Sequence, residues 1–97
     1  MNVSGTPRNL SREEVYRVFE AEQELKIDAG HVLMNVPAQE LFHAQYIQLV
    51  MMEDEIYNRF GIEKEEYNLL LGKYRLIEDE QVQERIRDVE ELLEPVQ

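Results

Sequence analysis

The sequence predicts an all-α protein, a small four-helix bundle. Apolar residues recur at helical spacing in four segments, and residues typical of helix ends lie on either side of these segments. The strand-like alternation of apolar and polar residues is absent. The expected helices cover about 11–29, 37–60, 63–74 and 79–93. Residues 1–10 are expected to form a flexible leader and 11–97 a single helical domain, because 97 residues suffice for one modest core.

The first expected helix has the most complete start signal. Ser11 is a favoured N-cap residue, and Glu14 three positions later completes the capping-box pattern. Leu10 and Val15 have the spacing of a hydrophobic staple, in which two apolar side chains pack across the start of a helix. Gly30 is typical of the residue just beyond a helix, so we expect the helix to end there.

The second expected helix opens at Pro37 and is followed by Gly61. Its apolar face is wide, which predicts a central helix that contacts more than one neighbour. This face comprises Phe42, Tyr46, Leu49, Val50, Ile56, Tyr57 and Phe60. Glu53 lies within it and is expected to pair with a Lys or Arg of another helix or subunit, since buried charges are normally paired. On the first helix, Glu22 is expected to pair with Lys26 four residues later.

The third and fourth expected helices both open with acidic residues, which favour the positive end of the helix dipole. The fourth helix carries a short coiled-coil seam with 4-3-4 spacing, made of Val82, Ile86, Val89 and Leu93. Further apolar residues lie off the main face of the second helix: Leu41, Ile47, Met51 and Met52. We expect the seam and these four residues to bind a partner, because methionine-rich apolar surface suits adaptable contacts.

The charge balance excludes several classes of function. With 21 acidic and 10 basic residues, the net charge of −11 repels nucleic-acid phosphates and anionic lipids, so neither nucleic acid nor membrane is an expected partner.

The absence of cysteine excludes disulfides and thiolate metal sites. No secretion signal or membrane-spanning apolar run is present, so a soluble, cytoplasmic protein is expected. Without a glycine-rich phosphate loop, and with Ser4 and Ser11 as the only serines, enzymatic activity is not expected.

An alternative function rests on Glu40 and His43, which form an E-x-x-H pair on the second helix. If the first two helices form a hairpin, Glu22 stands at nearly the same height as this pair. In these three residues the chain resembles ferritin-like di-iron proteins, where a helix glutamate and an E-x-x-H pair form half of a carboxylate site. The resemblance implies iron or another divalent metal. It also implies a dimer, because the chain has no second E-x-x-H.

The function expected first is a non-enzymatic interaction or adaptor module without a cofactor. It would be an acidic helical bundle, completed by self-association into a homo-oligomer, that presents an apolar groove to a basic or amphipathic helix of a partner protein. Two alternatives stay open. One is the metal-binding dimer, and the other is an acidic mimic of nucleic acid that occupies a basic site on another protein.

Overall fold

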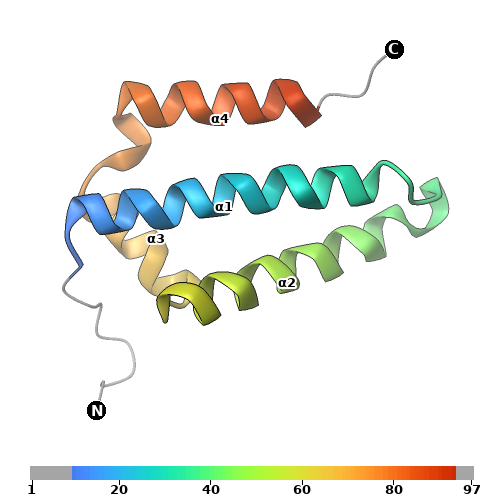
Figure 1. Cartoon of the computed structure of the whole chain (residues 1–97), viewed down its shortest axis with the longest axis horizontal. Helices are drawn as coiled ribbons and strands as arrows, with labels where there is room; N and C mark the ends of the chain where they lie inside the picture. The colour runs from blue at the N-terminus through green and yellow to red at the C-terminus, as the bar shows by residue number, and fades with distance from the viewer. Residues whose placement is uncertain (1–9, 94–97) are drawn as a thin grey trace.

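The structure, a computed structural model, describes residues 10–93 (Figure 1). Its α-helices are α1 (Arg12–Leu33), α2 (Leu41–Phe60), α3 (Lys64–Lys73) and α4 (Glu80–Leu93), with short 3-10 turns η1 (Ala38–Glu40) and η2 (Leu76–Glu78). No strand occurs in residues 10–93, so the predicted all-α bundle of four helices is confirmed. Of the predicted leader, only Leu10 lies within the described residues, and it packs against the core.

The central helix of the bundle is α1. It lies between α4, which runs parallel to it, and α2, which runs antiparallel, while the short α3 lies at the end where α1 begins (Figure 1). α1 packs against each of the other three helices. The prediction that the helix at 37–60 is central was therefore wrong. Most of the buried helical side chains belong to α1, whereas Ile56 is the one buried residue of α2.

The predicted start of α1 is confirmed. The backbone N–H of Glu14 donates to Ser11 Oγ (3.1 Å), and the backbone N–H of Ser11 donates to Glu14 Oε1 (3.0 Å). The hydrogen bond from the Ser11 backbone N–H, reinforced by the Ser11 side chain, stabilises the carboxylate and holds the pKa of Glu14 below its ordinary value. Val15 is completely buried and Leu10 packs against the same core, as the staple pattern predicts.

The predicted stop at Gly30 was wrong, because α1 continues to Leu33. Gly30 instead allows a close approach between helices. A Cβ atom at this position would overlap the side chain of Leu93, near the end of α4. Gly61 does end its helix as predicted: its φ of 66° is left-handed, and its N–H donates to the carbonyl of Tyr57 (2.7 Å).

The starts of α1 and α4 are joined by one side chain. Asp79 Oδ1 caps α4 by accepting from the backbone N–H groups of Gln81 (2.8 Å) and Val82 (3.3 Å). Its other oxygen accepts from Arg12 Nη2 at 2.7 Å. The Arg12 hydrogen bond and the backbone donors hold the pKa of Asp79 below its ordinary value. This residue therefore fixes both the beginning of α4 and its parallel alignment with α1.

The hydrophobic core lies at the end where α3 meets the other helices. It consists of Val15, Val18, Phe19, Ala21, Ile56, Ile62, Tyr67, Leu70, Leu76 and Val82. These residues come from the first half of α1, the end of α2, the α2–α3 connection, α3, η2 and the start of α4. At the opposite end, near the α1–α2 connection, no helix within residues 10–93 covers the bundle as α3 does, and several large apolar side chains are exposed there, among them Val32, Met34 and Phe42. The bundle is thus well covered at one end only.

The shared role of Asp79 can be tested by substitution. Asp79→Ala is expected to destabilise the protein more than Asp79→Asn, because Asn keeps a capping side chain and loses only the ionic contact with Arg12. The pKa of Asp79 is lower in the folded protein than in the unfolded chain, where it is about 4. Ionised Asp79 therefore stabilises the fold above about pH 4, and this stabilisation is lost as the pH falls through the pKa of the folded state. The difference in unfolding free energy between wild type and Asp79→Ala, measured by urea titration, should therefore shrink below about pH 4. A constant difference down to pH 2 would contradict this account.

The close approach at Gly30 predicts a coupling with Leu93. In a Leu93→Ala background, Gly30→Ala is expected to stabilise the protein by about 0.5–1 kcal/mol, the gain in helix propensity. In the wild-type background the new methyl group meets Leu93, so the same change should stabilise less or destabilise. Urea unfolding of the four proteins in this cycle measures the coupling. Equal effects in both backgrounds would show that the two side chains do not compete for space.

Candidate partner-binding face and adjoining pocket

The outer side of α2 is apolar and open to solvent. Phe42 is 86% exposed and Tyr46 is 64% exposed, which is unusual for aromatic side chains on a folded protein. Successive helix residues turn by about 100°, so Val50 points about 160° away from Met52, which faces the interior. The exposed large apolar residues on this side, called the outer face of α2 below, are Phe42, Tyr46, Ile47, Val50, Met51 and Tyr57; the remaining exposed one of α2, Leu49, lines a pocket between the helices.

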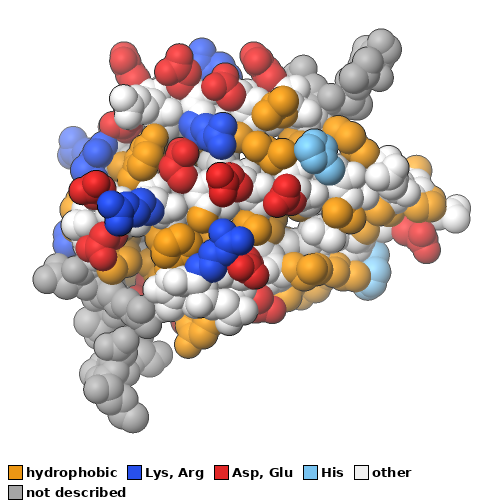
Figure 2. All heavy atoms as spheres, in the orientation of Figure 1, with side chains coloured by type: hydrophobic (Ala, Val, Ile, Leu, Met, Phe, Trp, Pro, Cys, Tyr) orange, Lys and Arg blue, Asp and Glu red, His pale blue; other side chains and the backbone are white. Residues whose placement is uncertain are grey.

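This face coincides with an uncharged stretch of the chain. Residues 41–52 contain no Asp, Glu, Lys or Arg, although 32% of all residues are charged. Figure 2 shows acidic and basic side chains over α1 and α4, and hydrophobic side chains along the edge formed by α2. Three aromatic and three aliphatic side chains together expose several hundred Å², the scale at which apolar patches on soluble proteins mark interaction sites.

Two of the predicted partner-binding residues of α2 lie on this face, and two do not. Ile47 and Met51 are exposed as expected. Leu41 and Met52 are half-buried, and Met52 lines a pocket between α1, α2 and α3. The sequence interpretation missed Phe42, Tyr46, Val50 and Tyr57 as candidates because it assigned them to the inward face. The uncharged stretch 41–52 was the signal that could have identified Phe42, Tyr46 and Val50, whereas Tyr57 lies outside it.

The predicted partner seam of α4 is used within the chain. Val82 is 0% exposed and Val89 is 3% exposed, and Ile86 packs against the core. Leu93 is half-buried beside Gly30. The seam therefore packs on α1 of the same chain, where its 4-3-4 spacing serves parallel helix packing. The expectation that this seam faces a partner is corrected accordingly.

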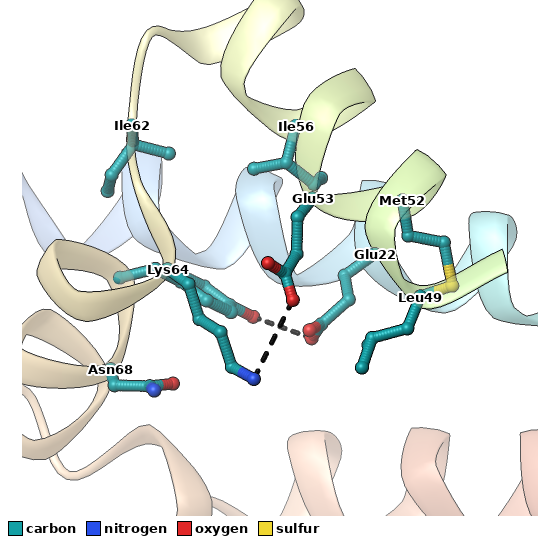
Figure 3. Close-up of a pocket in the computed structure, with 9 residues that line it drawn as sticks. Glu22, Leu49, Met52, Glu53, Ile56, Ile62, Lys64 and Asn68 are labelled. Carbon is teal, nitrogen blue, oxygen red and sulfur yellow. Dashed lines mark hydrogen bonds and ion pairs between the residues drawn. The ribbon is translucent and has the colours of Figure 1, made fainter. Parts of the chain in front are cut away.

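A small pocket lies on the other side of α2 from the outer face, where α1, α2 and α3 meet (Figure 3). Its volume of about 70 Å³ is enough for a few water molecules or the end of one side chain. Apolar side chains from α2 and the α2–α3 connection form one part of its wall: Leu49, Met52, Ile56 and Ile62. The polar part of the wall consists of Glu22, Glu53, Lys64, Tyr67 and Asn68.

Within the pocket, Glu22 is held by Tyr67. The buried Tyr67 Oη donates to Glu22 Oε1 at 2.9 Å, so Glu22 pairs across helices rather than with Lys26, which is exposed. Burial of the phenol, reinforced by the neighbouring carboxylate, raises the pKa of Tyr67 far above its ordinary value. The hydrogen bond links the middle of α1 to α3 and fixes the orientation of the carboxylate.

Glu53 behaves as the sequence predicted. Its carboxylate lies 3.7 Å from Lys64 Nζ, on a different helix. Both side chains are partly exposed, so the pair contributes little to stability and mainly closes one edge of the pocket (Figure 3).

The structure does not bring Glu22, Glu40 and His43 together. Among residues 10–93, no group of three His, Asp or Glu side chains is placed to hold a metal ion. Because α1 runs past Gly30 to Leu33, Glu22 lies level with Leu49 and Met52 in the pocket. These residues are roughly 9 to 14 Å further along α2 than His43, and Glu40 lies in η1 outside the helix. The hairpin register assumed for the metal alternative is therefore displaced by several residues.

The Glu22–Tyr67 hydrogen bond predicts an alkaline dependence of stability. Tyr67→Phe is expected to cost about 1–2 kcal/mol at neutral pH, because Glu22 loses a buried donor. A tyrosine whose folded pKa is raised stabilises the fold below its unfolded pKa of about 10 and loses that effect at higher pH. The difference between wild type and Tyr67→Phe in urea unfolding should therefore narrow above about pH 10. Tyr57→Phe, at an exposed position, is the control and should leave stability unchanged.

None of the helices in residues 10–93 is both long enough and apolar enough to cross a membrane. Comparison with protein-family models, with curated proteins and with solved structures found no match to this chain.

Proposed function

We propose that this protein is a non-enzymatic interaction module that binds an amphipathic helix along the outer face of α2. The observation that carries the proposal is the exposure of Phe42, Tyr46 and Tyr57 on a helix whose other side is already packed. Leaving several hundred Å² of apolar surface in water is unfavourable, so covering it with a partner supplies binding energy directly.

The geometry of α2 favours a helical partner. α2 spans Leu41–Phe60, which corresponds to a rod of roughly 30 Å. Its exposed residues follow each other at helical intervals along one side, the arrangement in which one amphipathic helix packs lengthwise on another. The groove anticipated from the sequence is thus replaced by the convex side of a single helix.

The proposal is tested by photo-crosslinking from the outer face. Benzoylphenylalanine replaces Tyr46 or Tyr57, both in the purified protein and in the source cells. Each probe is expected to form crosslinks to an apolar helix. Mass spectrometry identifies the crosslinked peptide. The control position is Leu69 on α3, which is equally apolar and exposed but lies outside the face. Crosslinking at Leu69 should be severalfold weaker. Equal yields at the three positions, or none from α2, would contradict the proposed function.

A further inference from the structure

The spacing of residues on the outer side of α2 indicates what covers it. His43, Ile47, Val50, Asp54 and Tyr57 follow one another at intervals of four, three, four and three residues. This is the repeat of a coiled-coil seam, and all five side chains are exposed. Tyr46 and Met51 flank the seam on its two sides. A seam of this kind packs best on a second helix with the same repeat.

We propose that the occupant of the outer face of α2 is a second copy of this chain, with the two α2 helices antiparallel about a twofold axis. The inference rests on the proposed function, because it takes the outer face as the binding surface and names the partner. A coiled-coil seam consists of alternating a and d positions, and in an antiparallel pair an a position of one helix faces a d position of the other. Ile47 of one copy then packs against Val50 of the second copy, and the twofold axis repeats the contact.

The same register pairs the two polar members of the seam. The pair His43 and Asp54 has the same midpoint along α2 as the pair Ile47 and Val50. His43 therefore faces Asp54 of the second copy at each end of the apolar contact, as an imidazole beside a carboxylate. Within one chain these residues are roughly 16 Å apart along the helix, too far for contact. This complementarity is available only between copies.

Charge also favours a second copy over a basic partner. A basic partner needs several carboxylates on the contact surface, yet the seam contains one, Asp54, residues 41–52 carry none, and Glu53 already pairs with Lys64. Two copies with a net charge of −11 repel each other at long range, so their contact is expected where acids are few. The uncharged stretch of α2 meets this condition, and the antiparallel arrangement also places opposite helix-dipole ends together.

The available area suits a dimer of moderate affinity. The outer face offers several hundred Å² per copy, somewhat below the ~800 Å² per partner of a standard stable interface. A dissociation constant of roughly micromolar order is expected. Because long-range repulsion is screened by salt, raising the salt concentration should strengthen the dimer, whereas binding to a basic protein would weaken.

Sedimentation velocity on the full chain tests the proposal, at about 10–300 µM protein and about 0.15 M or 0.5 M salt. Wild type should shift from monomer to dimer with concentration, and more so at the higher salt. His43→Asp places a second carboxylate opposite Asp54 at each end of the contact, and this repulsion should weaken the dimer about tenfold. The combined His43→Asp and Asp54→His change restores the pair with its members exchanged and should return the affinity to within about threefold of wild type.

The matched control is Gln45→Asp, which adds the same charge at an exposed position of α2 outside the seam. It should change the dimer affinity less than about threefold. All substituted side chains are exposed, and circular dichroism verifies that each variant is folded. Rescue by the exchanged pair is an effect that altered folding or net charge alone would not produce.

Two results would overturn the inference. A wild-type protein that stays monomeric at the highest concentration and salt excludes the second copy, and a dimer that His43→Asp leaves unchanged excludes the antiparallel register. The first result leaves the proposed function standing if Tyr46 or Tyr57 crosslinks to another protein. Absence of any crosslink from these positions removes the proposed function itself, so the two failures are distinguishable.

Discussion

The structure depends on the burial of the first half of α1 by three other elements at once. Val15, Val18 and Phe19 are almost completely removed from water, and they contact a core to which α2, α3 and α4 each contribute only a few residues. The capping box at Ser11 and the contact between Arg12 and Asp79 both fix the chain at this same end. Stability is therefore concentrated where α1 begins.

This concentration explains why α2 is apolar yet exposed. α3 and the connection before it cover only the end of α2, through Tyr67 and Leu70 of α3 and Ile62 of the connection, and α3 stops after Lys73. Within residues 10–93 the remaining length of α2 has α1 as its one helical neighbour, so one side is packed and the other is exposed. A helix that is apolar on nearly all sides normally lies in the interior of a protein. α2 is thus apolar both on its packed side and on its exposed side, and the exposed apolar side is the basis of the proposed function.

Local sequence signals predicted most of the fold, whereas signals that depend on neighbouring helices failed. The four helices, the capping box of α1 and the left-handed Gly61 were predictable because each depends on a few adjacent residues. Gly30 was read as a helix end, because its contact with Leu93 spans most of the chain and leaves no local trace. For a related reason, the buried seam of α4 was predicted to face a partner, and exposed residues of α2 were predicted to face inward. Periodicity identifies which side of a helix is apolar, but not which other helix covers it.

For the candidate site, the pairing of Glu53 with a basic residue of another helix was predictable from the cost of leaving a charge unpaired. The partner of Glu22 was not, because Tyr67 lies on a later helix and is indistinguishable in sequence from other core tyrosines. Glu22 does not meet the E-x-x-H pair, because α1 extends four residues beyond its predicted end and this extension shifts the register of the whole hairpin. A small error in the predicted end of a helix therefore displaces any predicted site that is assembled from two helices.

The parallel course of α1 and α4 bears on the order of folding. Helices α1 and α2 are consecutive and antiparallel, so they can associate through contacts that are close in sequence. The chain must then reverse through α3 and η2 before α4 can run alongside α1, and the contact between Arg12 and Asp79 joins residues separated by 67 positions. Contacts of such long range form after the loop-closure entropy has been overcome. Docking of α4, which completes the burial of Phe19 and Val82, is accordingly the expected late event in the formation of this bundle.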